Sequence, residues 1–232
     1  MNLLALDTAT EACSAALWRS GGDSIECFEL APRGHAQRLL PMIEQLLAEA
    51  GMHRHDLDAI AVGRGPGSFT GVRLAISVAQ GIALGLDRPV LTVSSLAALA
   101  QAVAADFPDS MLLACIDARM GEVYAGCYRA DADGLVAVAS AEAVGPAAQV
   151  ALAEASDWVV VGTGWASYPD ALRARIGTPR FADGTRYPHA AMIARLAAPA
   201  FARGEGVAPE LALPVYLRDK VALTVAERAG VS

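Results

Sequence analysis

A strand, a glycine-rich loop and a long apolar helix follow one another without a break over residues 59–86, and this stretch limits the possible folds more than any other. Residues 60–62 predict a short β-branched strand. The loop after it contains Pro66 and four glycines, which interrupt both helix and strand: Gly63, Gly65, Gly67 and Gly71. Such a junction can present free backbone N–H groups to an anion. It can equally be a tight crossover without a ligand, and the residues alone leave both interpretations open.

The helix predicted over residues 71–85 is apolar on nearly every face. Small residues recur along it four apart, in one ridge of Ser77, Gly81 and Gly85 and a second of Ala75 and Ala79. A helix that is apolar all round must be buried on both sides. One side can pack on its own sheet, and the other needs either the amphipathic helix predicted over residues 37–50 or a partner. We therefore predict helix–helix contacts to a partner at Leu39, Ile43, Leu46, Val72, Ala75, Ile76, Ala79, Gly81 and Leu84.

The composition favours an acidic cytoplasmic protein with a large core. Of its 232 residues, 54% are hydrophobic and only 19% are charged, and the net charge is −7. An acidic chain gains no general attraction to nucleic acid phosphates. The four cysteines lie in apolar, strand-like runs without zinc-ligand spacing, which suits a reducing compartment. The longest apolar run, 74–86, is too short to span a bilayer, so no membrane segment is expected.

The first half of the chain predicts an α/β unit that opens with an antiparallel meander. A polar turn with Asp7, Thr8 and Thr10 follows the first strand. The expected strands are 3–6, 12–18, 25–30, 57–62 and 89–93, and the expected helices are 37–50, 71–85 and 95–105.

The pattern restarts after a break at 107–109. Residues 112–117 again form an apolar strand that ends in aspartate, with a return strand at 122–128 and a turn at 131–134. Such self-similarity indicates a duplicated fold, although chance likeness of two apolar hairpins is the alternative. We predict halves at 1–108 and 109–212, and a tail at 213–232 that docks on the first half. Further elements are expected as helices at 147–155, 169–175 and 190–203, a strand at 158–161, and an extended segment at 213–218 followed by residues 221–228.

Two halves that each open with a meander and an aspartate-bearing turn resemble the ASKHA architecture of actin, Hsp70 and sugar kinases, with RNase H-like mixed five-stranded sheets flanked by helices. More specific motifs resemble the TsaB (YeaZ-type) family over nearly the whole chain. They are Leu-Ala-Leu-Asp-Thr-Ala-Thr at 4–10, His-Ala-Gln-Arg-Leu-Leu-Pro at 35–41, Gly-Arg-Gly-Pro-Gly-Ser-Phe-Thr-Gly-Val-Arg at 63–73, Asp-Ala-Arg-Met-Gly-Glu-Val-Tyr at 117–124 and Pro-Val-Tyr-Leu-Arg at 214–218.

That resemblance implies a role in forming threonylcarbamoyladenosine in tRNA, without chemistry of its own. It implies pairing with a TsaD-type paralogue, which transfers the threonylcarbamoyl group to adenosine N6, and recruitment of a TsaE-type ATPase. It also implies a homodimer when the chain is alone, and we expect contact with tRNA to be indirect.

The residues at the catalytic positions of the paralogue support this expectation. TsaD-type proteins carry a His-x-x-x-His metal pair where this chain has Ser95 and Leu99, and leucine cannot bind a metal. We therefore expect no metal or other cofactor. The resemblance places a vestigial nucleotide cleft, with weak or no ATP binding, at Asp7, Thr8, Thr10, Gly162 and Gly164.

Two catalytic alternatives remain at this stage. An active small-molecule kinase or acyl transferase of the same fold would use Asp7 and Asp117 as a carboxylate pair facing a nucleotide. A peptidase would need Ser68 as nucleophile, but its loop lacks the Gly-x-Ser-x-Gly elbow. The four histidines are scattered and none is placed by the sequence to activate it: His35, His53, His55 and His189.

Overall fold

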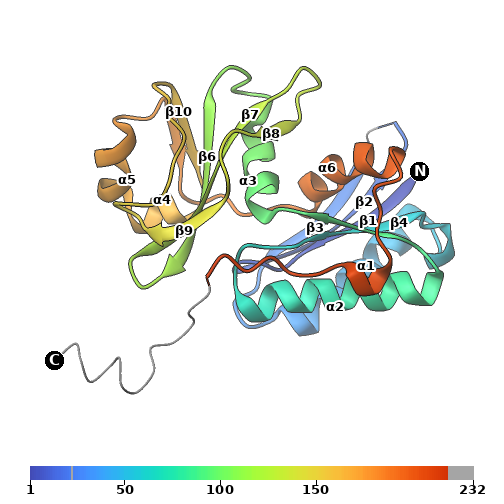
Figure 1. Ribbon diagram of the computed structural model, residues 1–232. Coiled ribbons are helices and arrows are strands. Elements are labelled where there is room, and N and C mark those ends of the chain that lie inside the picture. The colour runs from blue at the N-terminus through green and yellow to red at the C-terminus, as the bar shows by residue number, and fades with distance from the viewer. Residues whose placement is uncertain (22, 219–232) are drawn as a thin grey trace, which may run out of the picture.

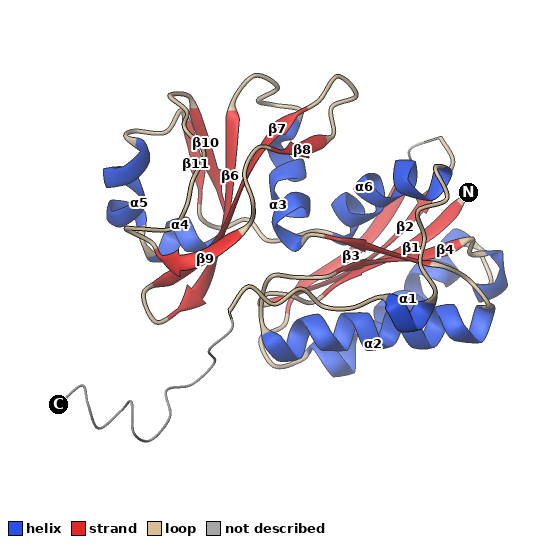
Figure 2. Ribbon diagram, in the orientation of Figure 1, coloured by secondary structure: helices blue, strands red, loops and turns tan. Residues whose placement is uncertain are grey.

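Two mixed β-sheets form the two halves of the molecule, with helices on their faces (Figures 1 and 2). The computed structural model describes residues 1–21 and 23–218. Residues 219–232 of the tail predicted to dock on the first half lie outside the described residues.

The first sheet has the strand order β3-β2-β1-β4-β5. The first three strands form the predicted antiparallel meander, and β4 and β5 are parallel to β1. The chain reaches this arrangement through the short hairpin turns after β1 and β2 and the helical crossovers that follow. The strands are β1 (Asn2–Asp7), β2 (Ala12–Arg19), β3 (Ser24–Leu30), β4 (Ala59–Gly63) and β5 (Val90–Val93).

The second sheet repeats this topology, in the order β8-β7-β6-β10-β11 with the same strand directions. One extra strand, β9, pairs with β7. The duplication predicted from the two hairpins is therefore confirmed, and the fold is a pair of ASKHA-like halves. The strands are β6 (Met111–Arg119), β7 (Glu122–Ala130), β8 (Val136–Val138), β9 (Ala143–Pro146), β10 (Trp158–Val161) and β11 (Phe181–Asp183).

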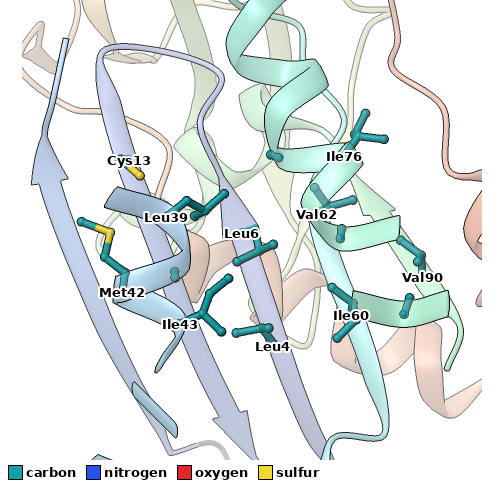
Figure 3. Packing of buried hydrophobic residues seen from close by; sticks show 14 of the residues in the cluster. Leu4, Leu6, Cys13, Leu39, Met42, Ile43, Ile60, Val62, Ile76 and Val90 are labelled. Carbon is teal, nitrogen blue, oxygen red and sulfur yellow. The ribbon is translucent and has the colours of Figure 1, made fainter. Parts of the chain in front are cut away.

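Helices cover both faces of the first sheet. α1 (His35–Ala50) and α2 (Phe69–Leu86) pack on one face, where Leu4, Leu6 and Val62 point toward them (Figure 3). Leu3 and Ala5 point to the opposite face, which is covered by α6 (Ala190–Ala202). Because β1 is buried on both faces, its residues 3–6 are all apolar rather than alternating with polar ones.

One helix from each half packs on the sheet of the other half. α3 (Ser95–Ala104), from the range assigned to the first half, packs on the second sheet through Leu96, Leu99 and Val103. α6, from the range assigned to the second half, packs on the first sheet. The two helices also contact each other. The ranges 1–108 and 109–212 are therefore not separately packed units, and both halves should unfold together.

Local signals explain where the helices begin and end. Ser68 caps α2 by accepting a hydrogen bond from Gly71 N, and Ser94 caps α3 by accepting from Leu96 N. Gly51 ends α1 with φ 63°, a left-handed conformation that glycine adopts without strain. These boundaries agree with the predicted helices to within a few residues.

The prediction of a helix at 147–155 was wrong. Gln149 N and Val150 N both donate to Pro146 O, which makes one turn that is not continued. The segment is instead anchored by Ala147 and Val150, which are buried against the second sheet. Tertiary burial therefore overrides the helix propensity of the alanines here. The short elements α4 (Thr163–Ser167), β9 and β11 were not predicted, whereas α5 (Pro169–Ile176) was.

The segment 213–218 crosses from one half to the other. Val215 N donates to Arg64 O at 2.9 Å, and Arg73 Nε donates to Tyr216 OH at 2.5 Å, both in the first half. Arg218 Nη2 donates to Ala118 O at 2.9 Å in the second half. This segment therefore makes hydrogen bonds to both halves.

By length and composition alone, α2 could cross a membrane. Its inner side, however, packs on the sheet through Val72, Ala75 and Ile76, and its outer side carries Arg73 and Gln80. This is the arrangement of a core helix in a soluble-type α/β fold.

Candidate functional site

The polar turn after β1 is closed by the glycine loop. Thr8 Oγ1 donates to Gly71 O at 2.6 Å, and Ser68 N donates to Ala9 O at 2.7 Å. A Cβ atom at Gly67 would lie 2.2 Å from Ala9 O, and one at Gly71 would lie 2.0 Å from Thr8 O. Only glycine allows two backbone segments to approach this closely. The glycine loop therefore makes a tight crossover against the polar turn.

The side-chain oxygens predicted to face a nucleotide mostly have partners within the protein. Asp7 and Thr8 are 1% and 0% exposed. Asp7 Oδ1 accepts from Ala9 N at 2.9 Å, and Oδ2 accepts from Ser95 Oγ at 2.8 Å. Only Thr10, which accepts from Ala12 N, lines a groove. The structure thus brings Asp7 to Ser95 and buries both.

The positions of the paralogue's metal pair are used for packing. Ser95 binds Asp7, and Leu99 is fully buried, with its Cδ2 atom 2.5 Å from where a Cβ at Gly162 would lie. Gly162 and Gly164 both lie against Cys115 on β6, so they serve close packing between a loop and a strand. A hydroxyl already bound to a carboxylate and a buried leucine do not fit a metal ion. Over residues 1–21 and 23–218, no three His, Cys, Asp or Glu side chains are grouped to hold one.

A groove of about 890 Å³ lies between the two halves. Asp117, the second candidate carboxylate of a kinase, lines it and accepts hydrogen bonds from Tyr168 OH and Arg119 Nη1. Asp7 does not line it, so the groove does not bring these two carboxylates together. Ser68 lines the groove but caps α2. The groove's walls come from residues 9–11, 32–35, 66–73, 116–119, 124 and 215–218.

Some of the predicted partner-contact residues are buried in the core and others are exposed. Seven of the nine pack in the core of the first half, namely Leu39, Ile43, Leu46, Val72, Ala75, Ile76 and Ala79. Figure 3 shows Leu39, Ile43 and Ile76 among them. Helical periodicity had identified the side of each helix that faces the sheet. Gly81 and Leu84 remain on the surface, and Leu84 is 72% exposed.

The outer face of α1 and α2 contains residues that sequence reasoning had not assigned to it. Leu40 on α1 is 51% exposed, and Ser77 and Gly85 on α2 are exposed beside Gly81. A largely apolar hollow of about 380 Å³ lies between the two helices, lined by Leu40, Leu47, Gly81, Ile82 and Gly85 among others. The small-residue ridge was the sequence signal that could have identified this face. We name Leu40, Ser77, Gly81, Leu84 and Gly85 the ridge face.

Substituting Asp7 tests whether it is only structural. Burial raises the pKa of its carboxyl, and its hydrogen bonds only partly oppose this. Since the folded-state pKa lies above the unfolded value, the stability associated with the protonated form is lost as pH rises through the folded pKa. In Asp7→Asn, the amide accepts from Ala9 N and donates to Ser95 Oγ without titrating. We expect its free energy of unfolding, relative to wild type, to increase as the pH rises above the unfolded-state pKa of about 4. Urea unfolding at several pH values measures this, and a constant or falling difference would contradict it.

Comparison with known proteins identifies the family. The family model for TsaD, tRNA N6-adenosine threonylcarbamoyltransferase, matches residues 29–224. The Escherichia coli (strain K12) protein named tRNA threonylcarbamoyladenosine biosynthesis protein TsaB is 45% identical over 96% of both chains. The Haemophilus influenzae protein of the same name is 37% identical over 95% of both. The crystal structure of YeaZ from Pseudomonas aeruginosa is 51% identical, covers 93% of this chain and 99% of its own, and superposes with a TM-score of 0.85. The chain therefore belongs to the TsaB (YeaZ-type) family.

Proposed function

We propose that this chain is a non-catalytic subunit required for forming threonylcarbamoyladenosine in cytoplasmic tRNA. In this proposal it pairs with a TsaD-type paralogue, which carries out the transfer, and the pair recruits a TsaE-type ATPase. The observation that carries the proposal is the contrast between a closed, buried polar turn and an exposed, small-residue helix face.

The ridge face suits a helix pair from another subunit. Gly81 and Gly85 have no atom within 4 Å of where a Cβ would lie, so a second helix could approach α2 there without displacing this chain's own atoms. Leu40 and Leu84 flank these glycines with exposed apolar side chains. Small residues permit close approach, and the flanking leucines gain from losing contact with water. In the absence of the paralogue, a second copy of the chain would occupy the same face.

Omission of the chain is the direct test of this role. With TsaD-type and TsaE-type partners, threonylcarbamoyl adenylate, ATP and unmodified tRNA, we expect modified adenosine to form only when the chain is added. Light scattering should show a homodimer alone and a heteromer with the paralogue. Equal product formation without the chain would contradict the proposal.

The competing kinase or acyl transferase proposal rests on the groove between the halves and would require nucleotide binding. We expect calorimetric titration of the isolated chain with Mg-ATP to show no micromolar binding, because Asp7 and Thr8 are already hydrogen-bonded inside the protein. Arg173→Ala, on α5 outside the groove, is a suitable charge control. Micromolar binding that Thr10→Ala weakens and Arg173→Ala does not would favour the enzyme proposal.

A further inference from the structure

The groove between the halves is locally basic although the chain is acidic. Four arginines and His35 line it, against the two carboxylates of Glu11 and Asp117: Arg33, Arg73, Arg119 and Arg218. Arg119 is paired with both carboxylates, and Arg218 is paired with Glu122. Within the described part of the chain, Arg33 and Arg73 have no carboxylate at ion-pair distance. The net charge of −7 is a sum over the whole chain, and it does not describe the local charge of this groove.

Arg73 lies over the Phe69 ring and beside the Tyr216 ring, two exposed aromatic rings at the edge of the groove. Its guanidinium carbon is 3.7 Å from the centre of the Phe69 ring and 5.5 Å from that of Tyr216. The two rings, 50% and 45% exposed as residues, have centroids 5.6 Å apart and are tilted by 31°. The hydrogen bond from Arg73 Nε to Tyr216 OH fixes the guanidinium plane. Its two Nη groups make no hydrogen bond to any residue that the structure describes.

A buried polar atom in the groove wall lacks a partner. His35 lines the groove, and its Nε2 atom is buried without a hydrogen bond to any described residue. An unpaired buried ring nitrogen is costly, so it indicates a ligand group or an ordered water at this position. His35 lies near the unpaired Arg33 in the chain, and both line the same groove.

We propose that this groove binds an unpaired stretch of RNA in the tRNA substrate. The inference rests on the proposed function, and it replaces the expected indirect contact with a direct one. Exposed rings provide surfaces on which bases stack, and planar guanidinium groups bind phosphates or stack on bases. An acidic peptide would use the arginines but would have no need for two exposed rings flanking one of them. The volume of about 890 Å³ is near the upper end for small-molecule sites, which leaves room for more than one nucleotide.

Binding to labelled RNA tests the proposal on the full chain. The probe is an unmodified tRNA transcript measured by fluorescence anisotropy at low salt, with ATP as competitor. We expect saturable binding that Phe69→Ala or Arg73→Ala weakens about five- to a hundred-fold, the usual range for losing one stacked base. Arg73→Lys keeps the charge but loses the planar group, and should still weaken binding. Arg173→Ala is the matched control: this arginine also lies over a ring, that of Trp165, and its removal changes the net charge equally.

The reconstituted modification reaction separates this inference from the proposed function. Phe69→Ala and Arg73→Ala should raise the KM for tRNA and leave kcat within about two-fold, because both residues bind rather than react. If the chain is required but both variants keep the wild-type KM and RNA affinity, the groove inference fails alone. If the chain is dispensable, the proposed function fails. If ATP displaces the RNA when present at only the same concentration as the RNA, the groove is a nucleotide site and not an RNA surface. If the wild-type chain shows no saturable RNA binding, the inference is also overturned.

Discussion

Gly81→Leu is expected to weaken pairing through the ridge face strongly while leaving the fold intact. Gly81 is exposed in the middle of α2, and nothing lies within 4 Å of the position of its missing Cβ. A leucine therefore fits the isolated subunit, and the gain in helix propensity stabilises it by up to about 1 kcal/mol. In a complex, the same side chain would lie where a second helix must approach closely. Overpacking of this kind costs ~1–3 kcal/mol, so we expect association to weaken by about five- to 150-fold.

Light scattering and co-purification with the TsaD-type paralogue measure this effect, and urea unfolding measures the stability of the subunit. Ala174→Leu is the matched control, because it adds a leucine to an exposed position of α5 on the second half. It should leave both association and stability close to wild type. If Gly81→Leu still forms the homodimer and the heteromer with wild-type affinity, the interface lies elsewhere.

Gly71→Ala is expected to cause a large loss of stability although it adds only one methyl group to α2. The new Cβ would lie 2.0 Å from Thr8 O and 3.1 Å from Thr8 C, so it meets backbone that cannot rotate away. The hydrogen bond from Thr8 Oγ1 to Gly71 O would also be strained. Overpacking costs typically range over ~1–3 kcal/mol and exceed this when the backbone must move, so we expect a loss of about 3 kcal/mol or more.

Gly81→Ala is the matched control for this prediction, since it makes the same chemical change in the same helix in open space. Its higher helix propensity should stabilise the protein by about 1 kcal/mol. Urea unfolding of both variants at low protein concentration measures the difference. Similar stabilities for the two variants would contradict the close approach of the glycine loop to the polar turn.

Much of this fold could be predicted because its local signals agree with its tertiary packing. The two hairpins, α1 and α2 follow from apolar periodicity, from the breaks at Gly51 and Pro66, and from the repeat of an apolar strand ending in aspartate. The exchange of α3 and α6 between the sheets could not be predicted. Both helices are apolar, and their sequences do not say which of two apolar sheets they cover.

The short elements could not be predicted from the sequence for a related reason. β9, β11 and α4 are three to five residues long, so too few positions exist to show a period. Residues 147–155 carry alanines that favour a helix, yet the burial of Ala147 and Val150 beside the second sheet decides their conformation.

Prediction of the candidate site from the sequence was limited in a similar way. The sequence indicated the polar turn with Asp7 and Thr8 and the glycine loop as separate features, and it could not show that their polar atoms satisfy one another. It identified α1 and α2 as contact helices but selected their core side, because the strongest apolar period marks the sheet-facing residues Leu39, Ile43 and Ala75. That the small-residue ridge faces away from the sheet is visible only once the sheet is in place.

The most direct test of the central claim compares two variants in one reconstituted modification reaction. The claim is that the chain acts through its surface and that its buried polar turn is structural. With both partners, tRNA and ATP present, we expect Asp7→Asn to support adenosine modification at close to the wild-type rate. Gly81→Leu should reduce modification in proportion to its lost association. Full activity with Gly81→Leu, together with loss of activity in a folded, partner-bound Asp7→Asn, would contradict the account.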